Sequence, residues 1–184
     1  MFEDNFPEYH EKIATLEEIE GVVSVRSVEA FLQWLYHQTV TFDEQDPKGQ
    51  ISAAIELARL ADMCNVTELE SQMARFIREL LIANYKVSYN NVRKSDRYSD
   101  YLKPQHIVSA SFLPQSHAVR RLLVAACVEA FLAEGDFEYS QVFKEYPALA
   151  IDLLEELRST LGGLKGAHNV IFTEPINGRR IQWI

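Results

Sequence analysis

The chain has 184 residues, of which 47% are hydrophobic and 11% aromatic, and its formal net charge is −9. This length suits a single domain, and the apolar fraction is typical of a globular protein rather than a disordered one. A negative net charge repels phosphate, and the short basic stretches form no continuous stripe, so we expect no nucleic-acid partner.

The cysteines and the N-terminus indicate the compartment. Cys64 and Cys127 fall in helix-like, apolar surroundings, so the sequence predicts two buried thiols in a reducing compartment. No Cys-x-x-Cys or His-x-x-x-His spacing occurs, and we expect neither a metal nor another cofactor. The N-terminus is acidic, unlike a signal peptide, and no apolar run approaches the ~20 residues that span a bilayer. We therefore expect a cytoplasmic or nuclear protein without membrane contact.

The first elements are predicted from the spacing of apolar residues. In residues 1–13, aromatic and aliphatic side chains recur every three or four positions, as on one face of a helix. Residues 14–25 contain several valines around Gly21 and predict a short strand.

Residues 27–37 predict a helix with a wide apolar surface. Ser27 can cap its start. Apolar side chains cover more than half of its circumference, which is typical of a helix packed on two sides. The predicted core residues of this helix are Phe31, Trp34, Leu35 and Tyr36. Residues 39–42 are β-branched or aromatic and predict a short strand, and residues 43–50 predict a polar loop.

Two further helices are predicted, one over residues 51–63 and one beginning at Thr67, joined as an αα-hairpin. Thr67 and Glu70 together match a capping box, in which each side chain accepts a backbone hydrogen bond from the other residue. Leu60 and Leu69 are the predicted core residues of this pair.

A second block of helices is predicted after a polar stretch. Residues 84–103 contain four tyrosines and predict a loop or linker. Ser116 can then cap a long helix that ends at Gly135, and a short helix precedes Pro147.

The C-terminal part combines a helix and a tail. A leucine stripe predicts a last helix that ends at Gly162-Gly163. In the tail, residues 164–184, Asn177-Gly178 lies between two β-prone runs and predicts a hairpin with a two-residue turn. The whole pattern predicts a mainly α fold with a small β component.

Candidate catalytic groups are scattered along the chain. The five histidines have no serine or cysteine nucleophile paired with them locally, and the carboxylate pairs are adjacent residues, which do not face each other on a helix. We therefore expect no enzyme. One alternative stays open, a small helical enzyme or ligand-binding protein with a pocket between the two helical blocks, lined by His106, His117 and Arg120.

Two long segments carry a family resemblance. SVEAFLQWLYHQTV, residues 27–40, followed by ISAAIELARLADMCNVTELESQMARFI, residues 51–77, resembles the second half of a BTB/POZ domain. The matching residues are Phe31, Trp34, Leu35, Tyr36, Leu60, Ala61, Asp62, Val66 and Leu69. The family usually has Thr-Gly or Ser-Gly after the tyrosine, where this chain has His37-Gln38.

Later segments extend the resemblance to residues 1–162. SHAVRRLLVAACVEAF and EYPALAIDLLEEL are similar to the helical extension of BTB proteins that are abundant in filamentous fungi. The resemblance divides the chain into a partial BTB/POZ-like domain (1–83), a loop or linker (84–103), a helical extension (104–163) and the tail (164–184). The family's N-terminal hairpin and first helix, which build much of its homodimer interface, have no counterpart here. The resemblance therefore leaves homodimerisation open.

The resemblance implies a protein–protein interaction module without catalytic activity. It implies a cullin-type ubiquitin-ligase scaffold, or a transcription or chromatin complex, as the partner. Tyrosine and tryptophan are enriched at interfaces, which makes the loop and tail aromatics candidate contacts. The candidate partner contacts are Tyr85, Tyr89, Tyr98, Tyr101 and Trp183. Local packing of the tyrosines within their loop is an equally acceptable interpretation.

Overall fold

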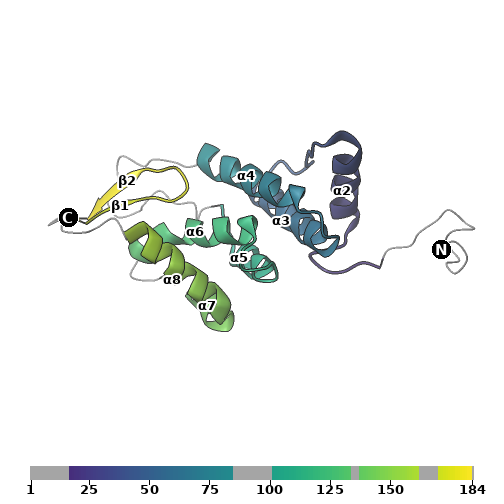
Figure 1. Cartoon of the computed structure of the whole chain (residues 1–184). Coiled ribbons are helices and arrows are strands. Elements are labelled where there is room, and N and C mark those ends of the chain that lie inside the picture. Colours follow the sequence, from purple (N-terminus) through teal and green to yellow (C-terminus); the bar gives the residue numbers. More distant parts are fainter. Residues whose placement is uncertain (1–16, 85–100, 134–136, 162–169, 184) are drawn as a thin grey trace, which may run out of the picture.

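The computed structural model describes residues 17–84, 101–133, 137–161 and 170–183 (Figure 1). These residues form seven helices and one two-stranded antiparallel sheet, which confirms the predicted mainly α fold with a small β component. The predicted helix over 1–13 and the helix ends at Gly135 and Gly162-Gly163 lie outside the described residues.

Helix α2 spans Val25–His37 and begins earlier than the sequence predicts. Its N-cap is Ser24, whose side chain accepts a hydrogen bond from the backbone N–H of Ser27 at 3.1 Å. The Ser27 hydroxyl in turn accepts from the backbone N–H of Ser24 at 2.9 Å. The prediction of Ser27 as N-cap was wrong because the two serines form a capping box in which Ser27 is the inner member.

Helices α3 (Pro47–Met63) and α4 (Glu68–Ala83) pack on each other as the predicted αα-hairpin. Asp46 caps α3 by accepting from Gly49 N–H, and Pro47 occupies the first turn, where its missing N–H costs nothing. At the start of α4, the Thr67 side chain makes no capping hydrogen bond. The capping-box prediction for Thr67 and Glu70 was therefore wrong, and the Glu70 carboxylate instead reaches another helix.

The second helical block contains α5 (Pro104–Ser111), α6 (Ala118–Ala133), α7 (Ser140–Glu145) and α8 (Pro147–Leu161). Ser116 does not adjoin α6 as predicted. The residue before α6 is His117, whose Nδ1 accepts a hydrogen bond from Val119 N–H at 3.2 Å. The imidazole thus takes the place of the predicted hydroxyl cap.

The tail forms the predicted hairpin, with β1 (Val170–Thr173) antiparallel to β2 (Arg180–Trp183). Its connection is wider than the predicted two-residue turn. Glu174 N–H donates to Arg179 C=O at 2.7 Å, and the Glu174 carboxylate accepts from Ile176 N–H and from Asn177 N–H, each at 2.8 Å. This folds the loop tip inward, and Ile176 is buried.

Two predicted strands are not formed in the described residues. Within 14–25, the part from Glu17 onward contains an isolated bridge between Ile19 and Val23 around Gly21, whose φ is +68°. Residues 39–42 have no regular structure. Strand-forming side chains do not suffice here because neither segment has a neighbouring strand to supply ladder hydrogen bonds.

One hydrophobic core joins the two helical blocks. It runs from Ala30 in α2 to Ile176 in the hairpin loop and includes buried side chains of every helix between them. Helix α4 packs on α6, and α3 packs on α5. The predicted linker, 84–103, therefore does not separate two cores.

Some of the residues predicted to lie in the core of α2, α3 and α4 are buried, and others are not. Trp34, Leu60 and Leu69 are buried, and Phe31 is half-buried and stacked on Trp34. Leu35 and Tyr36, however, are 48% and 81% exposed, so their assignment to the core was wrong. Helix α2 lies at the end of the molecule opposite the hairpin and packs chiefly on α3, which covers one side of it (Figure 1).

The cysteine predictions hold for one residue of two. Cys127 is fully buried in α6, and burial raises the pKa of its thiol. Cys64 is exposed, because it is the C-cap residue where the chain leaves α3 and turns towards α4. Both are free thiols.

Candidate functional site

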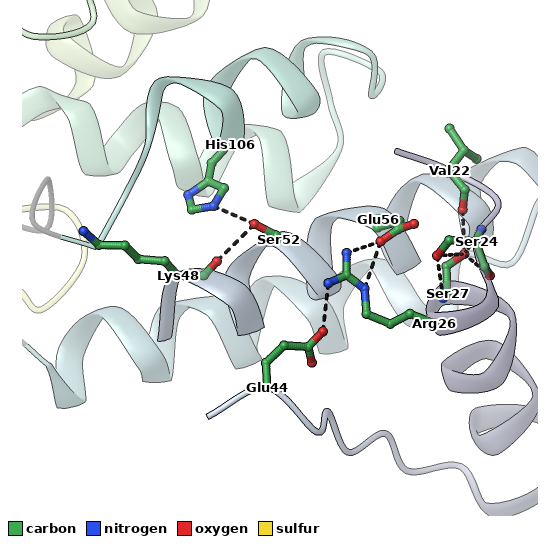
Figure 2. A network of polar contacts seen from close by, with 9 residues as sticks. All are labelled: Val22, Ser24, Arg26, Ser27, Glu44, Lys48, Ser52, Glu56 and His106. Carbon is green, nitrogen blue, oxygen red and sulfur yellow. Dashed lines mark hydrogen bonds and ion pairs between the residues drawn. The ribbon is translucent and has the colours of Figure 1, made fainter. Parts of the chain in front are cut away.

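A serine and a histidine from different blocks meet in the core. Ser52 lies on α3 and His106 on α5, and the Ser52 hydroxyl is 2.9 Å from Nε2 of His106 (Figure 2). His106 is 3% exposed. This pair invites comparison with a serine nucleophile and its base, so its proton arrangement decides what it can do.

The hydrogen bonds around the pair fix the positions of both protons. The backbone N–H of Lys103 donates to Nδ1 of His106 at 3.0 Å, so Nδ1 is an acceptor. In the neutral ring the proton is then on Nε2, which donates to Ser52 Oγ. The Ser52 hydroxyl donates to Lys48 C=O at 3.1 Å. A serine nucleophile needs the opposite arrangement, with the imidazole accepting the hydroxyl proton.

The environment of His106 favours this neutral ring. Burial, together with the nearby Lys103 ammonium, lowers the pKa of His106 to about 4. The imidazole is therefore uncharged at neutral pH and serves as a hydrogen-bonded link between α3 and the start of α5. We interpret Ser52 and His106 as a packing contact between the two helical blocks.

An ion-pair cluster one turn further along α3 holds α2 in place. The Arg26 guanidinium donates to the Glu56 carboxylate and, at 2.8 Å, to the Glu44 carboxylate (Figure 2). Glu56 is 6% exposed, so its charge needs this partner. Ser27 extends the same region by donating to Val22 C=O at 2.8 Å. The cluster fixes the start of α2 relative to α3 and the preceding turn.

His117 and Arg120, the other polar groups of the alternative pocket, are also buried in helix contacts. Burial lowers the pKa of His117, although the Glu70 and Asp62 carboxylates act in the opposite direction. The Glu70 carboxylate accepts a hydrogen bond from Ala118 N–H at 2.5 Å and so caps α6 from α4. These contacts join the start of α6 to the αα-hairpin.

Arg120 ties three elements together. Its Nε donates to Asp152 of α8 at 2.7 Å, and its Nη1 donates to Leu113 C=O at 2.9 Å beyond the end of α5. Arg120 and Asp152 are 5% and 7% exposed. In the described residues, no hydrogen bond joins His106, His117 and Arg120 to one another. Each of the three polar groups of the alternative pocket is thus engaged in a different helix contact.

The exposed surface of α2 is the most distinctive feature of the described residues. Val25, Leu32, Leu35 and Tyr36 are 76%, 45%, 48% and 81% exposed. Three of them, at positions 25, 32 and 36, are spaced by seven and four residues and lie on one side of the helix, with Leu35 beside them. The buried residues Ala30 and Trp34 lie on the opposite side. We call the four exposed side chains the α2 face.

The predicted contact residues have different positions. Tyr85, Tyr89 and Tyr98 lie outside the described residues. Tyr101 is half-buried and packs against the core, in line with the local-packing interpretation for this one tyrosine. Trp183 ends β2, and its side chain is outside the described part.

Other classes of site find no support in the described parts of the chain. There, no cluster of three or more histidine, cysteine, aspartate or glutamate side chains is suited to a metal ion. The helices in these ranges are too short or too polar to cross a lipid bilayer. Comparison of the chain with protein-family models, curated proteins and solved structures gives no match. The BTB/POZ resemblance therefore stays a prediction.

Proposed function

We propose that the chain is a non-catalytic protein–protein interaction module, an adaptor of the BTB/POZ type that acts in the cytoplasm or nucleus. The α2 face is the observation that supports this proposal. It places two leucines, a valine and a tyrosine side by side on a helix whose other side is fixed in the core. Contiguous exposed apolar surface of this kind is typical of binding sites.

The chemistry of the α2 face suits a partner with its own apolar surface. Full burial of an exposed leucine or valine side chain contributes about 1.5–3 kcal/mol. The leucines and the valine of the α2 face are already partly buried in the free chain, so a partner would gain only part of this amount from each. Tyr36 adds a large ring and a hydroxyl, a combination enriched among residues that dominate binding energy. Because α2 is held by Trp34 and the Arg26 ion pairs, the face needs little ordering on binding.

The resemblance suggests which partners to test first. A cullin-type scaffold would make the chain a substrate-recruiting subunit of a ubiquitin ligase. A transcription or chromatin complex is the second class. Either class of partner would bury the α2 face, so a charged substitution on this face should weaken the binding of both.

The test compares two charge-introducing substitutions at exposed apolar residues. Tyr36→Glu lies on the α2 face, and Leu154→Glu lies on α8 at 63% exposure. Proteins captured from cells by the unchanged chain and by Leu154→Glu, but lost with Tyr36→Glu, are partners of the face. One of these, purified, is then titrated against the chain by calorimetry. Identical partners and affinities for all three proteins would refute the role of α2.

A further inference from the structure

A groove lies between α4 and α6, which pack on each other, and no residue of α2 lines it. Each helix contributes residues at positions i, i+3, i+4 and i+7, which form one side of a helix over two turns. Helix α4 contributes Ser71, Ala74, Arg75 and Arg78, and α6 contributes Ala118, Arg121, Leu122 and Ala125. Glu156 of α8 completes the lining.

The groove has the size of a binding site for a short segment. It is open to solvent and has a volume of about 420 Å³, within the range of ligand pockets. Seven residue steps along each helix give a length of roughly 10 Å. Its floor is apolar, because three alanines and Leu122 lie between the polar side chains. A single leucine-sized side chain with its flanking backbone fits this shape.

The groove is positively charged on a negatively charged protein. Arg75, Arg78 and Arg121 line it against one carboxylate, Glu156. Arg75 is 3.9 Å from Glu79, a long contact between side chains that are 73% and 70% exposed, which neutralises little charge.

The guanidiniums of Arg78 and Arg121 form no ion pair within the described residues, so their charge can attract a ligand. Arg78 donates two hydrogen bonds to Ile176 C=O, which is neutral. The Arg121 guanidinium makes no hydrogen bond or ion pair within the described residues, although it also borders a second hollow with Glu155 and Glu156. Guanidinium groups bind carboxylates through paired hydrogen bonds, which favours a carboxylate-bearing ligand.

We propose that this groove binds an acidic peptide segment of a partner protein, with one apolar side chain on the alanine floor and carboxylates at the arginines. Charge complementarity favours an acidic ligand, because three arginines line the groove on a chain whose net charge is −9. A nucleic acid suits the groove less well, because its charged backbone extends far beyond a groove of this length and would meet the negative charge of the rest of the chain. The groove is a second binding surface of different chemistry, and it does not depend on the α2 face.

The experiment uses fluorescence anisotropy with a labelled peptide in which glutamates flank a single leucine. We expect Arg121→Glu to weaken binding about tenfold, and added salt to weaken binding to the unchanged chain. Arg158→Glu, at an exposed residue of α8 outside the groove, makes the same charge change and serves as the matched control. Arg78 is not used as a test position because it also holds the hairpin loop.

Two further variants separate groove binding from general attraction. Ala74→Phe fills the floor without changing charge and should also weaken binding. A peptide with glutamine in place of glutamate should lose most of its affinity. No binding of the acidic peptide, equal losses for Arg121→Glu and Arg158→Glu, or equally tight binding of single-stranded RNA at the same residues would each overturn the proposal. None of these results bears on the α2 face, because Tyr36 is unchanged throughout.

Discussion

Trp34 fixes α2 to the αα-hairpin. It is 6% exposed, and its indole N–H donates to the Gln72 side chain of α4 at 3.1 Å. Replacing a buried tryptophan by alanine leaves a cavity and an unpaired amide, so Trp34→Ala should lower the free energy of unfolding by about 3–5 kcal/mol. Urea denaturation measures this change. Tyr36→Ala, at an exposed residue of the same helix, should change it by less than about 0.5 kcal/mol.

His106 makes stability depend on pH. Its pKa falls from 6.5 to about 4 on folding, so between these values the unfolded chain binds more protons than the folded one. The free energy of unfolding should therefore decrease as the pH drops through this window, by roughly 3 kcal/mol in total. His106→Gln should flatten that part of a stability–pH curve obtained by urea denaturation. His37→Gln, at an exposed residue, is the control, and an unchanged slope in His106→Gln would contradict the assignment.

At the scale of helices, the contact between α6 and α8 includes the buried ion pair of Arg120 and Asp152. Asp152→Asn leaves the Arg120 guanidinium buried without its counter-charge and should destabilise the protein by about 3–5 kcal/mol. Replacing both residues by apolar ones of similar size, Arg120→Met with Asp152→Leu, should recover most of this loss. Thermal denaturation of the single and double variants measures the difference. A double variant less stable than Asp152→Asn would show that the Arg120 bonds to the α5 end dominate.

Sequence periodicity predicts the helices well because each depends on local patterns. Helices α3, α4 and α8 follow their apolar stripes, and Leu60 and Leu69 are buried as expected. Caps were predicted less well because several residues can compete for one position. Ser24 and Ser27 are both suitable N-caps by sequence, and in the structure Ser24 caps the helix while the Ser27 hydroxyl donates a hydrogen bond to Val22 C=O.

The candidate surfaces depend on packing between distant segments. Helix α2 is apolar on more than half of its circumference, and the sequence cannot tell which apolar side faces α3. Leu35 and Tyr36 were assigned to the core for this reason. The lining residues of the groove follow the same spacing in α4 and in α6, but their meeting depends on how two helices from different blocks pack.

At the scale of the whole molecule, a core that joins both helical blocks predicts cooperative unfolding. The hairpin loop inserts Ile176 into the core at 1% exposure, and Arg78 and Glu129 hold the loop through hydrogen bonds to Ile176 C=O and Arg179. Deleting the tail would therefore expose core side chains and disturb the fold. If the shortened chain lost its partners, the loss could come from this disturbance and would not identify a contact in the tail. A point substitution at Trp183 is the cleaner test of the predicted contact there.

Ile176→Ala tests whether the hairpin loop and α2 belong to one cooperative unit. The substitution should lower the free energy of unfolding by about 2–5 kcal/mol. Tryptophan fluorescence in a Trp183→Phe background reports only on Trp34, at the opposite end of the molecule, whereas circular dichroism reports on all helices (Figure 1). Because one core joins both ends, the two signals should shift to the same lower denaturant midpoint. A Trp34 transition that keeps its original midpoint while the helical signal shifts would mean that the two blocks unfold separately.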